Sequence, residues 1–419
     1  MTPFGRLIRD LSPHALLTLS DHLVACESHH HALFLEQAIT DALGGEGWGV
    51  RQKASFEAWF ALLQTLVREA GAATPAAVLT VATDVFSALG HGLLQFEVTA
   101  AGGTARGAAL YHGHGFLEKY GERMPNRKPL CAFAAGFCSA AASLAYPSDW
   151  GILEAEEVSC VGRGDAECTF LLVRKPMHSR SGLVMTRAAA AAMPADLPDP
   201  SRDALAAEAS RRTARILEET AADGAGSVRL FGVRLALVPT AYTGQITFDT
   251  MHLVEKRMMD LFPAYFALVR EASTMGAFHT LGGALIEDAR RRGVHVSRDP
   301  TERLAIMVGA ARALGWGGFY VTEHRPGKHL SLAAAVTHES AYYAARHGGT
   351  IRQRLAAHQG IAVAMTLLLA DVDFRRPDPI LPSTYSDLMA GPVRHHVEEV
   401  HSVLRGDSHS EVSVETLHL

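Results

Sequence analysis

The chain contains the same short pattern twice, which indicates a duplicated domain. Residues 155–170 read AEEVSCVGRGDAECTF and residues 397–412 read VEEVHSVLRGDSHSEV, so their Glu-Glu-Val and Arg-Gly-Asp triplets coincide without a gap. A second echo precedes the first in each copy, because Ala-Leu-Gly followed by Phe-x-Val-Thr occurs at residues 88–99 and again at 313–322. The echoes are about 242 and about 225 residues apart, so we expect two related domains with an insertion of roughly 15 residues in the second.

Length and residue patterns favour several mixed domains. A chain of 419 residues exceeds what one hydrophobic core usually serves, and its 48% apolar and 20% charged residues are ordinary for a globular protein. We expect an α+β fold in which antiparallel sheets pack against helices. The expected parts are an N-terminal helical region (1–74), a first copy (75–175), a linker with a charged helix (176–227) and a second, degenerate copy (228–419).

Charge and hydropathy exclude some partners and compartments. A net charge of −5 gives no basic surface for nucleic acid, so we expect no direct nucleic-acid binding. The most apolar stretch, residues 130–146, is too short to span a membrane and indicates a buried helix. We find no secretion signal in the first residues, and five cysteines, an odd number, do not suggest a disulfide framework. We therefore expect a cytoplasmic protein.

Local signals place the elements around the repeated pattern. Thr74-Pro75 is a favourable helix start, and that helix is expected to stop at Gly90. Residues 228–238 alternate as a strand, and residues 247–270 and 276–292 have helical patterns.

Glu157, Cys160 and Cys168 have the residue types and spacing of a zinc site. Glu157 and Cys160 lie three residues apart at the end of an expected strand, and Cys168 follows a glycine-rich turn at residues 162–165. The glycines let the chain reverse tightly, so the three side chains can face one point. Zinc in structural sites favours a closed tetrahedron of four such ligands.

The fourth ligand and the second copy leave alternatives open. Cys131 and Cys138 on the preceding helix are both candidates for the fourth ligand, and buried free cysteines also occur simply as small hydrophobic residues. Both hairpin cysteines are replaced together in the second copy, by Ser402 and Ser410, which favours a shared metal in the first. Only Glu399 survives there, so we expect no metal in the second copy.

Four short segments of the first copy follow one family pattern. They are Pro129-Leu130-Cys131, Gly136-Phe137, Glu157-Val158-Ser159-Cys160 and Gly162-x-Gly164-Asp165-x-x-Cys168-x-Phe170. This set resembles the 4-vinyl-reductase domain family, and especially the aromatic-effector sensor domains of bacterial enhancer-binding transcription activators. The resemblance covers about residues 75–175 and is weak over about 300–415. It implies a zinc ion bound by Cys131, Glu157, Cys160 and Cys168, with Cys138 outside the site.

The resemblance also implies an apolar ligand pocket near the zinc. His112 stands where the sensors place an aromatic residue that anchors a phenolic hydroxyl, so a ligand here is expected to differ from phenol. The alternative is that His112 and His114 lie on a surface loop and the aromatic residues are core. The candidate pocket residues are His112, His114, Phe116, Phe133, Phe137 and Trp150.

These observations favour a ligand-binding or regulatory protein. It would sense a small apolar or aromatic molecule in a zinc-stabilised domain and signal through a protein partner, as a homodimer. Four protein ligands leave no open zinc position for a catalytic water. The first alternative is an assembly or adaptor scaffold, similar to vesicle-tethering subunits that belong to the same family. The second is a reductase, which the absence of a dinucleotide fingerprint disfavours.

Overall fold

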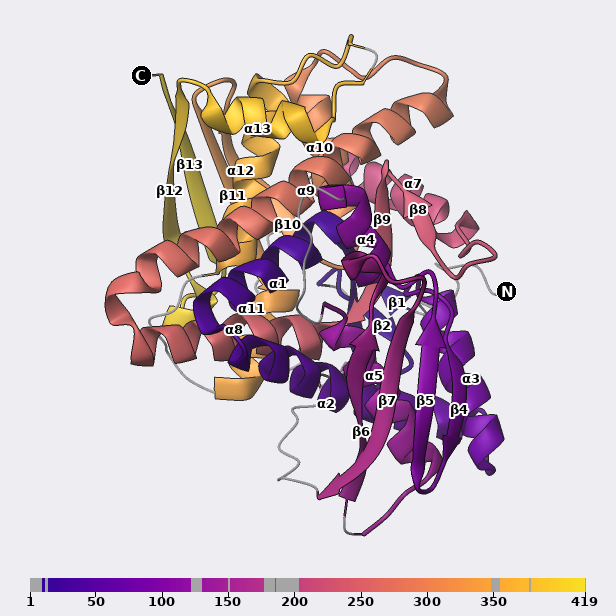
Figure 1. The fold of residues 1–419 in the computed structure, drawn as a ribbon. Helices are drawn as coiled ribbons and strands as arrows, with labels where there is room; N and C mark the ends of the chain where they lie inside the picture. The colour runs from indigo at the N-terminus through magenta and orange to yellow at the C-terminus, as the bar shows by residue number, and fades with distance from the viewer. Residues whose placement is uncertain are drawn as a thin grey trace.

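The protein has an α+β fold built from three antiparallel sheets and the helices that cover them (Figure 1). This confirms the expected fold class. The computed structural model describes residues 10–11, 14–121, 130–149, 151–176, 185, 203–347, 355–376 and 378–418. Trp150 and residues 177–184 and 186–202 of the expected linker lie outside the described residues.

The first half of the chain forms one repeat that ends in a four-stranded sheet of order β4-β5-β7-β6. Its elements are β1 (Asp10–Leu11), β2 (Leu17–Leu19), β3 (His22–Ser28), α1 (His29–Leu43), α2 (Glu46–Glu69), α3 (Pro75–Ala88), β4 (Gln95–Thr99), β5 (Gly102–Gly107), α4 (Tyr111–Tyr120), α5 (Ala132–Ala145), β6 (Gly151–Ser159), the 3₁₀ turn η3 (Val161–Arg163) and β7 (Cys168–Pro176).

The second half repeats this order after the connecting helix α7 (Ala204–Glu219), and its sheet has the equivalent order β10-β11-β13-β12. Its elements are β8 (Val228–Leu230), β9 (Val233–Pro239), α8 (Thr240–Arg257), η5 (Met259–Leu261), α9 (Phe262–Arg292), α10 (Pro300–Ala313), β10 (Gly317–Arg325), β11 (His329–Thr337), α11 (His338–His347), α12 (Ala356–Ala370), α13 (Pro382–Ala390), β12 (Val393–His401), η6 (Val403–Arg405) and β13 (Ser410–His418).

The duplication predicted from the sequence is therefore present in the topology. The extra residues of the second copy are accounted for by α13, which lies between α12 and β12 and has no counterpart between α5 and β6. The repeating unit also includes the first strand hairpin and two helices, at residues 17–69 and 228–292, which the sequence analysis did not recognise as related. The two four-stranded sheets lie at opposite ends of the molecule (Figure 1).

Local signals explain several element boundaries. The Thr74 side chain accepts a hydrogen bond from the Ala77 amide at 3.2 Å, so α3 begins where the Thr-Pro pair predicts. The stretch expected as one strand at 228–238 is a hairpin, because Phe231 and Gly232 both have positive φ, 56° and 74°, and make a tight turn.

Two further expectations are corrected by burial and packing. Residues 17–28 form strands inside a region expected to be helical, since every residue of β3 is buried and Val24 to Ser28 pair with β9 of the other repeat. The break between α8 and α9 falls at residues 258–261, not 271–275. Gly276 stays inside α9, where a β-carbon would lie 2.5 Å from Cβ of His31, so close helix packing requires the glycine.

The two repeats are joined through a shared sheet of order β1-β2-β3-β9-β8. Strand β3 pairs antiparallel with β9, and Cys26 opposite Leu237 lies at the middle of that ladder. The Cys26 amide donates to the Leu314 carbonyl at 2.9 Å, and the Leu237 amide donates to the Leu89 carbonyl, also at 2.9 Å. Each repeat therefore binds a turn of the other, the turn after α3 in the first repeat and the turn after α10 in the second. The two contacts are related by approximate two-fold symmetry.

Side chains from those turns repeat the same exchange. The Trp316 indole donates to the Cys26 carbonyl at 2.7 Å, and the His91 ring nitrogen donates to the Leu237 carbonyl at 2.8 Å. Both bonds are buried, so losing either leaves a carbonyl without its partner in the interior. Within the described residues, no helix has both the length and the apolar character needed to cross a bilayer.

Candidate metal centre and neighbouring cavities

The structure brings four sequence-predicted residues together between α5 and the β6–β7 hairpin. Cys131 is the residue before α5, Glu157 lies on β6, Cys160 precedes η3 and Cys168 begins β7. All four are buried, and one donor atom from each lies within 4.8 Å of the others. Cys138 is buried further along α5 and is not part of this cluster. The cluster could hold a metal ion.

The spacing of the three sulfur atoms matches the needs of a tetrahedral zinc site. The Sγ of Cys131 lies 3.6 Å from that of Cys160 and 3.8 Å from that of Cys168, and Cys160 and Cys168 are 3.7 Å apart. Zinc–sulfur bonds of about 2.3 Å at the tetrahedral angle place two sulfurs about 3.8 Å apart. The donor set therefore fits zinc in both chemistry and spacing.

The Glu157 carboxylate also orders the start of α5. It accepts hydrogen bonds from the amides of Leu130, at 2.6 Å, and Cys131, at 3.2 Å. Burial, followed by the neighbouring Cys160, raises the pKa of Glu157 to about 8. The sulfurs of Cys131 and Cys160 stabilise the Cys168 thiolate and lower its pKa to about 5. Negative charge on several of these groups at once is costly, and a divalent cation offsets that cost.

A rigid turn holds Cys160 toward the cluster. The Cys160 amide donates to Oδ2 of Asp165 at 2.7 Å, and the Asp165 amide donates back to the Cys160 carbonyl at 3.2 Å. Gly164 adopts φ 94°, a left-handed conformation that glycine adopts without strain. Helix α4 closes the other side, because a β-carbon at Gly113 would lie 3.2 Å from Sγ of Cys168.

The second repeat keeps this scaffold without the thiols. The Ser402 amide donates to Oδ2 of Asp407 at 2.7 Å, as Cys160 does to Asp165, and Gly406 has φ 93°. Leu355 takes the place of Cys131 before the helix, and its amide donates to Glu399 at 3.1 Å. The Glu399 carboxylate thus still accepts a hydrogen bond at the start of the helix, although leucine and serine replace the cysteines.

A second group of possible metal ligands lies on the outer face of the β12–β13 hairpin of the second repeat. Donor atoms of His401, His409 and Glu411 lie within 4.8 Å of one another. His401 has 46% of its side chain exposed, so its nitrogen competes with water for any ion. These three residues differ from the buried cluster in position and environment, and any ion there would exchange easily with solvent.

The first expected pocket residue, His112, lies on helix α4 and is buried, not on a surface loop. Its Nε2 lies 3.3 Å from Oε1 of Glu36. The same carboxylate accepts from the Tyr242 hydroxyl at 2.8 Å and from the Arg51 guanidinium at 2.9 Å. His112 therefore belongs to a buried polar network that joins α4, α1, α2 and α8.

The expected aromatic wall is packed by neighbouring rings. Phe133 lies 5.8 Å from Trp59 and 4.9 Å from His91, measured between ring centroids. Phe137 lies 5.0 Å from Trp59 and 4.3 Å from Phe86. All of these rings are buried, so side chains fill the interior beside the cysteine–glutamate cluster.

The remaining pocket candidates are more dispersed. Phe116 is buried on α4 and packs against Tyr120, with 4.8 Å between ring centroids. His114 is only partly buried, and its Nε2 bonds the Ala108 carbonyl. Trp150 lies outside the described residues.

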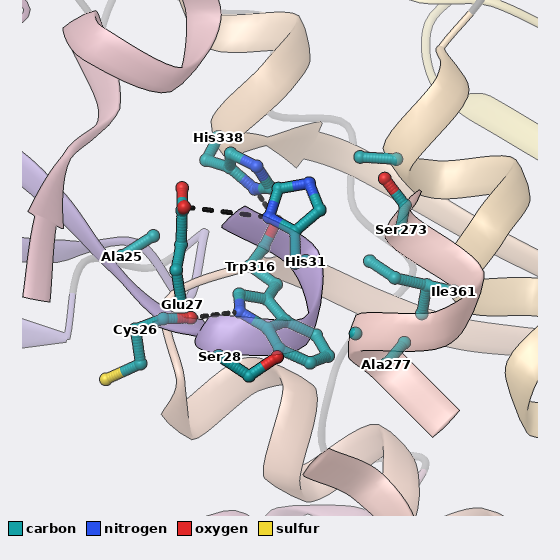
Figure 2. A pocket seen from close by; sticks show the side chains of 12 residues that line it. Ala25, Cys26, Glu27, Ser28, His31, Ser273, Ala277, Trp316, His338 and Ile361 are labelled. Atoms are coloured by element: carbon teal, nitrogen blue, oxygen red, sulfur yellow. Dashed lines mark hydrogen bonds and ion pairs between the residues drawn. The ribbon is translucent and has the colours of Figure 1, made fainter. Parts of the chain in front are cut away.

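In the second repeat, a small cavity lies where the first repeat has its packed aromatic rings (Figure 2). Its volume is about 30 Å³, enough for one or two water molecules. Figure 2 shows the Trp316 indole, His31 and His338 among the side chains that line it, and Glu27 lies 3.6 Å from His31. These polar groups come from β3, α1, the turn before β10 and α11, so both repeats contribute to the cavity.

Sequence differences between the repeats explain this cavity. Gly136 of α5 packs on Ser55, and Gly360 of α12 packs on Ser273 in the same way. These two pairs align the helices of the repeats. In that alignment Trp59 corresponds to Ala277, Phe133 to Ala357 and Phe137 to Ile361, so smaller or aliphatic side chains replace the rings.

Comparisons with known proteins add little to this picture. No family model matches the chain, and no curated protein matches it. Among solved structures, the chain is similar to the phenol-responsive sensory domain of the transcription activator PoxR, crystallised with phenol. The match has 15% identity and a TM-score of 0.33, and it covers 52% of this chain and 91% of that one. A similarity of this strength assigns neither a ligand nor a function.

Proposed function

We propose that this protein is a ligand-binding regulatory module whose first repeat is stabilised by a structural zinc ion. Cys131, Glu157, Cys160 and Cys168 would bind the ion. The spacing of the three sulfurs, 3.6 to 3.8 Å, is the observation that carries the proposal.

A zinc ion in this position would tie the start of α5 to the β6–β7 hairpin. Four protein donors complete a tetrahedron, so the ion would contribute folding energy and would not activate water. This favours a binding or regulatory role over hydrolytic catalysis.

The sensed molecule, in this proposal, is small and apolar or aromatic. The interior beside the metal cluster is lined by rings such as Phe133 and Phe137, with His112 as a polar contact. Because these rings are closely packed, a ligand there must displace them, and α5 links that movement to the metal-bound hairpin. Occupancy would then be passed to a protein partner, or to a second copy of the chain in a homodimer.

Native mass spectrometry tests the metal part of the proposal. After brief dialysis against a mild chelator, which clears exposed sites, we expect one zinc per chain. Cys160→Ser and Cys168→Ser should each lower that occupancy strongly. Cys138→Ala is the matched control, because this buried cysteine lies on α5 outside the cluster. Full zinc occupancy in both serine variants would contradict the assignment.

Calorimetry and partner capture test the regulatory part. We expect saturable binding of a neutral aromatic probe such as toluene, weakened by His112→Ala or by zinc loss. A protein partner that binds the zinc-loaded chain should respond to that probe. Zinc-loaded protein that binds no such probe would remove the sensor role and leave only a zinc-stabilised scaffold.

A further inference from the structure

A large cavity lies where the two repeats meet, away from the metal cluster. It has a volume of about 610 Å³, within the range of small-molecule sites. Helices α1, α4 and α9, the β8–β9 hairpin and residues 378–386 form its walls. It is far larger than the 30 Å³ cavity of Figure 2, so it has room for a ligand without side-chain movement.

Stacked imidazoles line one wall. His30 lies 4.1 Å from both His29 and His279, measured between ring centroids, and its ring is stacked on His279 at 24°. His30 is 7% exposed, and within the described residues its Nδ1 has no hydrogen-bond partner. Burial lowers the pKa of His29 and of His279 to about 4, so both rings are neutral near pH 7. The wall is therefore flat, polarisable and uncharged.

Lys119 supplies a cation beside these rings. Its Nζ lies 3.4 Å from the His30 carbonyl and 3.3 Å from Sδ of Met275, and it lies over the Phe34 ring at 5.4 Å. In the described part of the chain, no carboxylate forms an ion pair with Lys119. Burial lowers the pKa of Lys119 to about 8, so most of its charge remains at pH 7. An ammonium in such surroundings gains from a bound anion.

The other charged groups do not cancel this preference. Glu118 is shared by Arg229 and Arg234, which leaves that group with a net positive charge. Glu287 pairs with two arginines at the end of α9. Asp378 is exposed to solvent, where its charge is screened.

We propose that this cavity binds a small aromatic carboxylic acid, with its carboxylate at Lys119 and its ring against the His30–His279 stack. The site is separate from the metal cluster and lies beyond the function proposed above. Apolar contacts on the remaining walls, from Phe231 and Ile380 among others, suit the body of such a molecule.

Isothermal titration calorimetry with benzoate and with benzyl alcohol, its neutral analogue, tests this site. In the full chain, benzoate should bind at least tenfold more tightly than benzyl alcohol. Lys119→Met should abolish that preference, and Lys119→Arg should keep it within threefold. The control is Lys53→Met, because Lys53 is 59% exposed and does not line the cavity. This variant should leave the affinities for both probes unchanged.

Equal affinities for the two probes, or benzoate binding unchanged in Lys119→Met, would overturn the proposal. Thermal melting and zinc content of each variant are measured alongside. A Lys119→Met variant that melts normally, keeps its zinc and loses benzoate supports this site independently of the metal proposal. Should that variant not fold, Lys119→Arg decides, since loss of benzoate binding with the charge retained would also contradict the proposal.

Discussion

Replacing Gly113 with alanine tests the packing around the cluster of Cys131, Glu157, Cys160 and Cys168. A β-carbon at Gly113 would lie 2.8 Å from Cγ2 of Val161, 3.2 Å from Sγ of Cys168 and 3.4 Å from Sγ of Cys131. Carbon atoms pack best at about 3.5–4.0 Å, so the new methyl group overlaps the loop that holds the cluster. Overpacking of this kind costs about 1–3 kcal/mol, against a gain of about 1 kcal/mol from alanine in a helix.

The matched control is Gly49→Ala, also a glycine-to-alanine change within a helix. No atom lies within 4 Å of a β-carbon at Gly49, so this variant should gain up to about 1 kcal/mol of unfolding free energy. Gly113→Ala should be the less stable of the two by about 1–3 kcal/mol in urea unfolding. It should also release zinc faster to a chromogenic chelator. If the two variants were equally stable and released zinc at the wild-type rate, the close packing of α4 on the cluster would be refuted.

Three further predictions concern the second repeat and the junction. Burial raises the pKa of Glu339 to about 8, so its contribution to stability is full below pH 4.5 and is lost as pH rises through 8. Glu339→Gln should therefore gain stability relative to wild type across that window, and a pH-independent difference would contradict this. The triple variant Leu355→Cys, Ser402→Cys, Ser410→Cys should add one buried zinc per chain, and unchanged metal content would refute the equivalence of the repeats. Trp316→Phe removes a buried hydrogen bond between repeats and should cost about 1–3 kcal/mol in urea unfolding, whereas a loss under about 0.5 kcal/mol would refute its role.

The repeated pattern and the cysteine spacing predicted much of the structure. The echoes around Glu157 and Glu399 gave the duplication, because both hairpins keep the same turn. The spacing predicted that Glu157, Cys160 and Cys168 lie close together, as they do in the structure, since the glycine-rich turn fixes their geometry locally. The choice of Cys131 over Cys138 depends on where α5 begins, which spacing alone left open.

Contacts between repeats were beyond the sequence analysis. Strand β3 is buried on all sides by β9 and by helices of both halves, so its residues show no alternation that would mark a strand. Glu36 and Glu27 were missed because partners such as Tyr242 and Thr243 come from the other repeat. A polar residue within an otherwise apolar helix face was the available signal for Glu36.

X-ray absorption at the zinc edge tests the central claim most directly. For the purified full chain, we predict three sulfur neighbours at about 2.3 Å and one oxygen at about 2.0–2.2 Å. Cys168→Ser should lose one sulfur from that shell. A shell of only nitrogen and oxygen, or one unchanged by the substitution, would contradict a zinc ion bound by Cys131, Glu157, Cys160 and Cys168.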